Sequence, residues 1–139
     1  MIEFKNLTKR FPGGKIAVDS LNLTFNDGEF IVFIGTSGSG KTTSMRMINR
    51  MIEPTSGEIL INGKNSKDMN AVELRRQIGY VIQQIGLMPH MTIFDNIVMV
   101  PKLLKWPVEK QRKIAEELIQ KVDLPLDFLE RYPSELSGG

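Results

Sequence analysis

Residues 35–42 have the sequence GTSGSGKT, the pattern of a phosphate-binding loop. The apolar run FIVFI at residues 30–34 precedes it and TSMRMI at residues 43–48 follows, so the expected order is buried strand, tight turn and helix. Glycines at positions 35, 38 and 40 let the backbone curl until successive N–H groups point into one concavity. The helix adds the positive end of its dipole. The loop therefore predicts a site for the phosphates of a nucleoside triphosphate.

Each side chain of the loop has an expected role. Lys41 is expected to reach the β- and γ-phosphates and is a candidate catalytic residue, while the Thr42 hydroxyl is expected to ligate Mg²⁺. The alternative is a plain flexible glycine-serine loop, which the flanking strand and helix patterns disfavour. The predicted ATP contacts in this loop are Gly35, Thr36, Ser37, Gly38, Ser39, Gly40, Lys41, Thr42 and Thr43.

Composition narrows the class of protein without identifying it. The 139 residues suit one domain, with 41% hydrophobic and 24% charged residues. The net charge is +2 and the basic residues are scattered, so no nucleic-acid partner is expected. The absence of cysteine excludes disulfides and thiolate metal sites. No apolar stretch approaches the roughly 18 residues of a membrane span, and the N-terminal residues are not those of a signal peptide.

The first part of the chain reads as strands around the phosphate loop. Alternating apolar residues predict strands at 2–8 and 21–25, and a central strand is expected at 30–34. A helix is expected at 41–51, followed by a strand at 58–62 that ends in an Asn-Gly turn. Asn70 and Glu73 predict the capped start of a short helix, and a strand at 78–82 runs into Gln83.

The second part reads as helical. Apolar residues recur at helical spacing between residues 86 and 104, and a helix is expected from 107 to about 123, with a short one at 126–132. The apolar face predicted for the longer helix consists of Val108, Ala115, Leu118, Ile119 and Val122. The predicted domains are a nucleotide-binding core at 1–85 and a helical subdomain at 86–139.

Residues 136–139 have the sequence LSGG. Alone this is a weak motif, and a serine-glycine helix start at Ser137, itself a candidate anion site, explains it. After a phosphate loop and a helical segment, however, the chain resembles the ATP-binding subunit of ABC transporters, whose signature motif begins LSGG. The resemblance implies an α/β fold: a P-loop NTPase (ABC ATPase) core with N-terminal antiparallel strands and a helical subdomain.

The resemblance assigns roles to further residues. Gln83 matches the family's Q-loop glutamine, which implies contact with Mg²⁺ and the attacking water; an ordinary strand-end glutamine is the alternative. Phe11 stands where the family places an aromatic residue that stacks on adenine, although tyrosine is more usual there. The signature residues Ser137, Gly138 and Gly139 are implied to close over ATP held by a second subunit, so a homodimer is expected in the complete protein.

Four stretches resemble one subfamily, the bacterial importers of quaternary-amine osmoprotectants such as glycine betaine, carnitine or choline. They are MINRMIEP at 47–54, IGYVIQQIGL at 78–87, PHMTI at 89–93 and VPKLLKWP at 100–107. An importer for amino acids stays open, because nothing in these residues contacts the solute. Residues 86–106 resemble the surface that receives a transmembrane permease subunit, which implies a cytoplasmic protein at the inner face of the bacterial membrane. A plain solvated helix pair is the alternative for that surface, and His90 is expected to be an exposed residue.

The sequence also lacks motifs that the family uses for hydrolysis. No run of four apolar residues is followed by Asp-Glu, so the Walker B aspartate and the catalytic glutamate are missing. The expectation is a chain truncated before the Walker B strand, such as a gene fragment or split reading frame, inactive as an ATPase alone. Two other readings stay open: a non-catalytic nucleotide-binding module, and an ABC-type ATPase of DNA repair or translation, which the short helical part disfavours. A small-molecule kinase would not explain Gln83 and LSGG.

Overall fold

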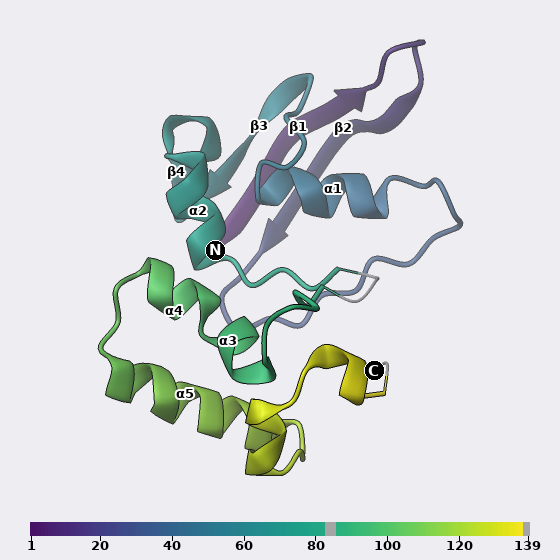
Figure 1. The fold of residues 1–139 in the computed structure, drawn as a ribbon. Helices are drawn as coiled ribbons and strands as arrows, with labels where there is room; N and C mark the ends of the chain where they lie inside the picture. Colours follow the sequence, from purple (N-terminus) through teal and green to yellow (C-terminus); the bar gives the residue numbers. More distant parts are fainter. Residues whose placement is uncertain (83–85, 138–139) are drawn as a thin grey trace. The chain divides into compact units, whose positions relative to one another are not determined.

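Two structural units make up the chain in the computed structural model, Met1–Gly79 and Tyr80–Gly139. The structure describes residues 1–82 and 86–137 (Figure 1). No helix in these two ranges is long and apolar enough to cross a membrane.

The first unit is built on an antiparallel sheet with the strand order β2-β1-β3-β4. Its strands are β1 (Ile2–Arg10), β2 (Ile16–Phe25), β3 (Ser56–Ile61) and β4 (Lys64–Asn65). Phe4 is paired with Leu23 of β2 on one side and with Ile59 of β3 on the other. The predicted strands at 2–8, 21–25 and 58–62 are confirmed, although β2 begins five residues earlier than expected. The predicted turn is confirmed as well, since Asn62 and Gly63 both have positive φ, 49° and 77°.

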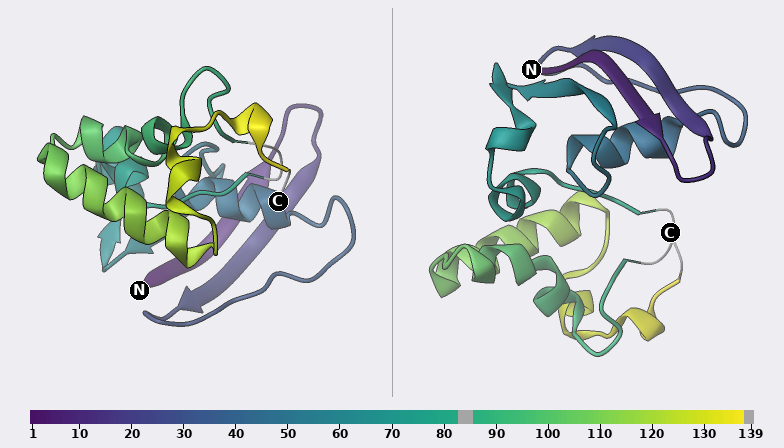
Figure 2. Two further views of the ribbon diagram at one scale, coloured as in Figure 1. Left: turned by 60° about the horizontal axis from the view of Figure 1, so that its bottom comes forward. Right: turned by 90° about the horizontal axis from the view of Figure 1, so that it is seen from above.

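The helix α1 (Lys41–Ile48) covers one face of this sheet (Figures 1 and 2). Met47 of α1 is fully buried in a core with Phe4, Leu7, Val18 and Ile59. Burying one such methionine side chain contributes about 1.5–3 kcal/mol. The phosphate loop therefore leads into a helix that the core of the unit holds in place.

Two short helical segments follow the sheet, η1 (Ser66–Asp68) and α2 (Ala71–Gln77). The side-chain oxygen of Asn70 accepts hydrogen bonds from the backbone N–H groups of Val72 (2.9 Å) and Glu73 (3.2 Å). These bonds satisfy two donors that a helix start otherwise leaves unpaired. The predicted capped helix is confirmed.

The predicted strands at 30–34 and 78–82 are wrong for this structure, because neither segment forms a strand. Phe30, Ile34 and Val81 are 94%, 93% and 93% exposed. A continuous apolar run suits a strand covered on both faces, but such a strand also needs hydrogen-bonded neighbours. The strands described for residues 1–82 pair only with one another, so these segments have no partner.

The second unit is helical, as predicted. It contains α3 (Ile93–Ile97), α4 (Met99–Leu103), α5 (Val108–Lys121), η2 (Leu126–Glu130) and η3 (Pro133–Glu135). Its core consists of five buried side chains: Ile93, Val98, Ala115, Ile119 and Leu129.

The predicted apolar face of α5 is only partly correct. Ala115 and Ile119 are buried, but Val108, Leu118 and Val122 are exposed. The third buried position of the helix is Gln111, whose side-chain amide donates a 2.8 Å hydrogen bond to the backbone oxygen of Trp106. A satisfied amide can be buried at little cost, and this bond moves the buried stripe to positions 111, 115 and 119.

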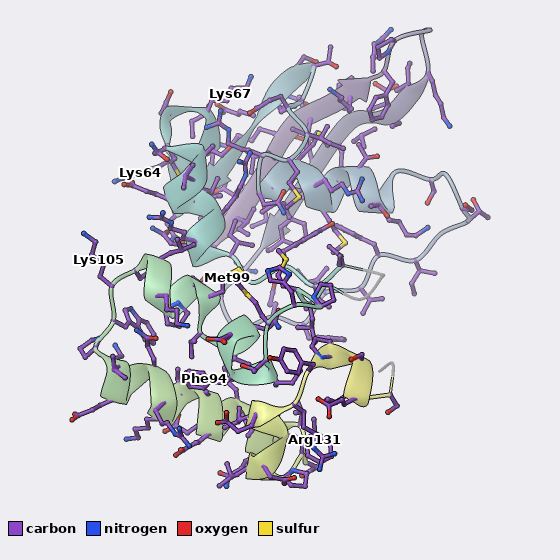
Figure 3. The ribbon with its side chains drawn as sticks, in the orientation of Figure 1. Lys64, Lys67, Phe94, Met99, Lys105 and Arg131 are labelled. Atoms are coloured by element: carbon purple, nitrogen blue, oxygen red, sulfur yellow. The ribbon has the colours of Figure 1, made fainter. Side chains whose placement is uncertain are left out.

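The start of α3 carries a local ion pair. Thr92 caps the helix by accepting from the backbone N–H of Asp95, and the Lys102 ammonium donates to the Asp95 carboxylate at 2.6 Å. Lys102 also lies 5.9 Å from the ring centroid of Phe94, which is labelled in Figure 3. The hydrogen bond from Lys102 is the main cause that lowers the pKa of Asp95 below its usual value.

We expect acid to weaken the second unit through Asp95. Because folding lowers the pKa of this carboxyl, its stabilising contribution is present above about pH 4 and is lost as the pH falls further. The effect will be small, since the pair is partly exposed. Urea unfolding at pH 6 and pH 3, followed by the fluorescence of the single tryptophan, Trp106, measures the free energy of unfolding. Asp95→Asn should reduce the difference in this free energy between the two pH values. The control Asp127→Asn should leave the contribution of Asp95 to that difference intact.

Candidate nucleotide-binding site

The phosphate loop turns sharply into α1 through two glycines with positive φ. Gly38 has φ 82° and Gly40, the N-cap of α1, has φ 91°. The backbone N–H of Ser39 donates to the oxygen of Thr36 at 3.2 Å and closes a tight turn. A Cβ at position 40 would overlap the backbone oxygen of Ala17 in β2. Glycine therefore lets the start of the helix approach the sheet.

The Lys41 side chain folds back into the loop. Its ammonium donates hydrogen bonds to the backbone oxygens of Gly35 (2.7 Å) and Thr36 (2.8 Å) and to the Ser39 hydroxyl (3.2 Å). The structure thus brings four of the predicted residues together around one positive charge. Of the remaining predicted loop residues, Ser37, Gly38 and Thr42 are exposed and Thr43 is half-buried.

This loop has the chemistry that a phosphate group requires. An ammonium group lies at the loop, and the first turn of α1 adds N–H donors without helical partners and the positive end of the helix dipole. Residues 1–82 and 86–137 contain no cluster of three or more His, Cys, Asp or Glu residues that could hold a metal alone. Thr42 is exposed in the first turn of α1, and its role as a Mg²⁺ ligand stays a prediction; Gln83, the second predicted ligand, lies outside the described residues.

Phe11 begins the turn between β1 and β2 and is half-buried. Its backbone N–H donates to the Lys15 oxygen at 2.9 Å, and its own oxygen accepts from Gly14 at 3.1 Å. The Lys9 ammonium lies 5.3 Å from the ring centroid, within the range of a cation–π interaction. Stacking of adenine on Phe11 stays a prediction.

The signature motif lies in the second unit. Leu136 packs against the core of that unit, and Ser137 is exposed. Gly138 and Gly139 lie outside the described residues, so the predicted contact of these three positions with ATP stays a prediction. His90 is exposed, as expected.

Sequence reasoning missed two arginines beyond the other end of α1. The side chains of Arg50 and Arg75 donate hydrogen bonds to several backbone oxygens around the end of this helix. The sequence offered one signal. Glycine is frequent just after the end of a helix, and this chain has an arginine, Arg50, at that place.

The comparisons with known proteins agree with the motifs. The family model described as ABC transporter matches residues 18–139. The chain is 63% identical to the carnitine transport ATP-binding protein OpuCA of Listeria monocytogenes, over 100% of this chain and 35% of that protein. It is 59% identical to the glycine betaine/carnitine/choline transport ATP-binding protein OpuCA of Bacillus subtilis, over 100% of this chain and 37% of that protein. The chain thus spans little more than a third of the length of these relatives.

A solved structure extends the similarity to the fold. The dimeric structure of MJ0796, a bacterial ABC transporter cassette, matches with a TM-score of 0.86 and 36% identity, covering 99% of this chain and 64% of that one. The antiparallel sheet, the phosphate loop and the helical unit are therefore part of an ABC ATPase fold. The chain belongs to the ABC transporter family.

Proposed function

We propose that this chain binds Mg-ATP at residues 35–42 and forms part of the ATPase subunit of an importer for a quaternary-amine osmoprotectant. The observation that carries ATP binding is the Lys41 ammonium, held at the centre of the loop by three oxygen atoms. The substrate class is supported by the names of the two OpuCA relatives, which are about 60% identical over the whole chain.

Each residue of the proposed nucleotide site, in the loop and outside it, has a separate role. Lys41 exchanges its backbone oxygen partners for the β- and γ-phosphate oxygens, and the N–H groups of the first turn of α1 donate to the same phosphates. Thr42 supplies a hydroxyl ligand for Mg²⁺, and Gln83 supplies a side-chain oxygen near the γ-phosphate. Bound Mg²⁺ would neutralise charge on the phosphates. Phe11 provides the flat face on which adenine stacks.

Hydrolysis and transport belong to the complete protein. We propose that Ser137, Gly138 and Gly139 of one subunit face the ATP held by another, an arrangement supported by the dimeric cassette that this chain resembles. Residues 86–106 would receive a transmembrane permease subunit at the inner face of the bacterial membrane. Closure of the dimer over ATP and its reopening after hydrolysis would then move the permease.

A chimaera tests the importer assignment. The 139 residues replace the corresponding part of the Listeria carnitine protein, and carnitine uptake is measured in cells that lack the native subunit. We expect uptake with the unmodified segment and none when the segment carries Lys41→Ala. Normal production and membrane association of the chimaera without carnitine uptake would contradict this assignment and favour an amino-acid importer or a non-catalytic module.

A further inference from the structure

The end of α1 has an unusual backbone conformation. Arg50, two residues after the last residue of the helix, has φ 55°, in the left-handed region that favours glycine. The backbone N–H groups of Met51 and Ile52 both donate to the oxygen of Arg46, which closes the helix end. A left-handed arginine is costly unless its surroundings hold it.

Hydrogen bonds of the Arg50 side chain stabilise this left-handed conformation. Its guanidinium donates to the backbone oxygens of Ser66 (3.1 Å) and Met69 (2.8 Å), in and just after η1, and to the Glu53 carboxylate (2.9 Å). Lys67 marks η1 in Figure 3. Only 18% of this side chain is exposed, so these bonds are partly shielded from water. Arg50 therefore joins the end of α1 to the segment that precedes α2.

Arg75 joins the same place to α2 itself. Its Nε donates to the backbone oxygen of Asn49 at 3.0 Å, and its Nη2 donates to the backbone oxygen of Arg50 at 2.6 Å. Both oxygens lie just beyond the end of α1, where the negative end of the helix dipole favours a cation. Arg50 also donates to the backbone oxygen of Lys67 at 3.4 Å. The two arginines thus form a brace, which we define as Arg50, Arg75 and the five backbone oxygens that they bind.

We propose that this brace sets the position of α1 so that the phosphate loop at its other end is preorganised for the nucleotide. The helix has eight residues and is packed through Met47, so a shift at one end moves the other. Arg75 is accordingly a positioning residue that touches neither phosphate nor Mg²⁺. This inference rests on the proposed binding of Mg-ATP.

The chain offers a matched control. Arg75 and Arg76 are neighbours on α2 and both are exposed, but the hydrogen bonds to Asn49 and Arg50 come from Arg75, so Arg76→Gln removes the same charge without touching the brace. We expect Arg75→Gln to weaken Mg-ATP binding about tenfold and Arg76→Gln to change it less than about twofold. We also expect Arg75→Gln to accelerate hydrogen exchange of the α1 amides about tenfold, while exchange in β1 and β3 stays unchanged.

Two further variants separate positioning from general stability. Arg75→Lys keeps the positive charge and an N–H-donating group, and it should recover most of the lost affinity. Arg50→Gly relieves the strain of the left-handed backbone but removes the guanidinium. If the brace holds α1, hydrogen exchange of the α1 amides should still be faster in this variant than in the unmodified chain. Slower exchange would overturn the role given to Arg50. Equal α1 exchange in Arg75→Gln and Arg76→Gln would also overturn the proposal. Absence of ATP binding by the unmodified chain would refute the proposed function, and the exchange data would still decide whether the brace holds α1.

Discussion

Replacing Lys41 with methionine will reduce the affinity of the chain for Mg-ATP about a hundredfold. The variant keeps the length of the side chain but removes the ammonium that donates to Gly35, Thr36 and Ser39 and would pair with the phosphates. Losing a hydrogen-bonded charge pair to a bound ligand costs about 3 kcal/mol, which corresponds to this change in affinity. Isothermal titration calorimetry with Mg-ATP measures it.

Lys64→Met is the matched control, because Lys64 is an exposed lysine in β4 of the same unit. Its affinity should stay within about twofold of the unmodified chain, since a distant exposed charge contributes little. Far-ultraviolet circular dichroism should show the same helix and strand content in both variants. An equal loss of affinity in the two variants would assign the effect to net charge and would contradict the role given to Lys41.

Replacing Gly57 with alanine will remove much of the stability of the first unit. Gly57 is the second residue of β3, beside β1, and has φ 78°. A Cβ at this position would overlap the carbonyl oxygen of Asn6 and lie 2.6 Å from the carbonyl oxygen of Lys5. The left-handed backbone costs about 1–2 kcal/mol for alanine, and forcing the strands apart adds about 1–3 kcal/mol. We therefore expect a loss of about 3 kcal/mol in the free energy of unfolding.

Gly63 separates the two causes. It has nearly the same φ, 77°, but an added Cβ meets no atom within 4 Å, so Gly63→Ala carries the backbone strain alone. We expect Gly63→Ala to cost about 1–2 kcal/mol. Native-state hydrogen exchange of β1 and β3 amides is the right measurement, because the single tryptophan, Trp106, reports on the second unit. Equal losses in the two variants would show that strand proximity at Gly57 has no energetic effect.

The features that the sequence predicted correctly are those that local chemistry decides. The Asn-Gly turn at 62–63 and the Asn70 cap depend on neighbours within a few residues. The alternation in β1 and β3 is also a local pattern, and it was confirmed because each strand finds the other as a pairing partner. The tight turn that leads into α1 is of the same kind, because its glycines and Lys41 lie within seven positions of one another; its contacts with phosphate stay a prediction.

The features that were wrong depend on distant partners. The apolar runs at 30–34 and 78–82 have the composition of buried strands, but a strand exists only when another strand accepts its hydrogen bonds. The end of α1 depends likewise on Arg50 and Arg75, whose oxygen partners lie up to 26 positions away. The buried face of α5 includes Gln111 because of one bond to Trp106, which hydrophobic periodicity does not reveal.

Mapping of amide chemical shifts on titration with Mg-ATP shows directly whether the nucleotide binds at the phosphate loop. We expect saturable shifts concentrated at residues 35–43, with the largest changes at Gly38, Gly40 and Lys41, and no comparable shifts in α5. In the same titration of Lys41→Met, the amide chemical shifts of residues 35–43 should stay unchanged. A folded chain that shows no saturable shifts at residues 35–43, or shifts of similar size in both units, would contradict nucleotide binding at this loop.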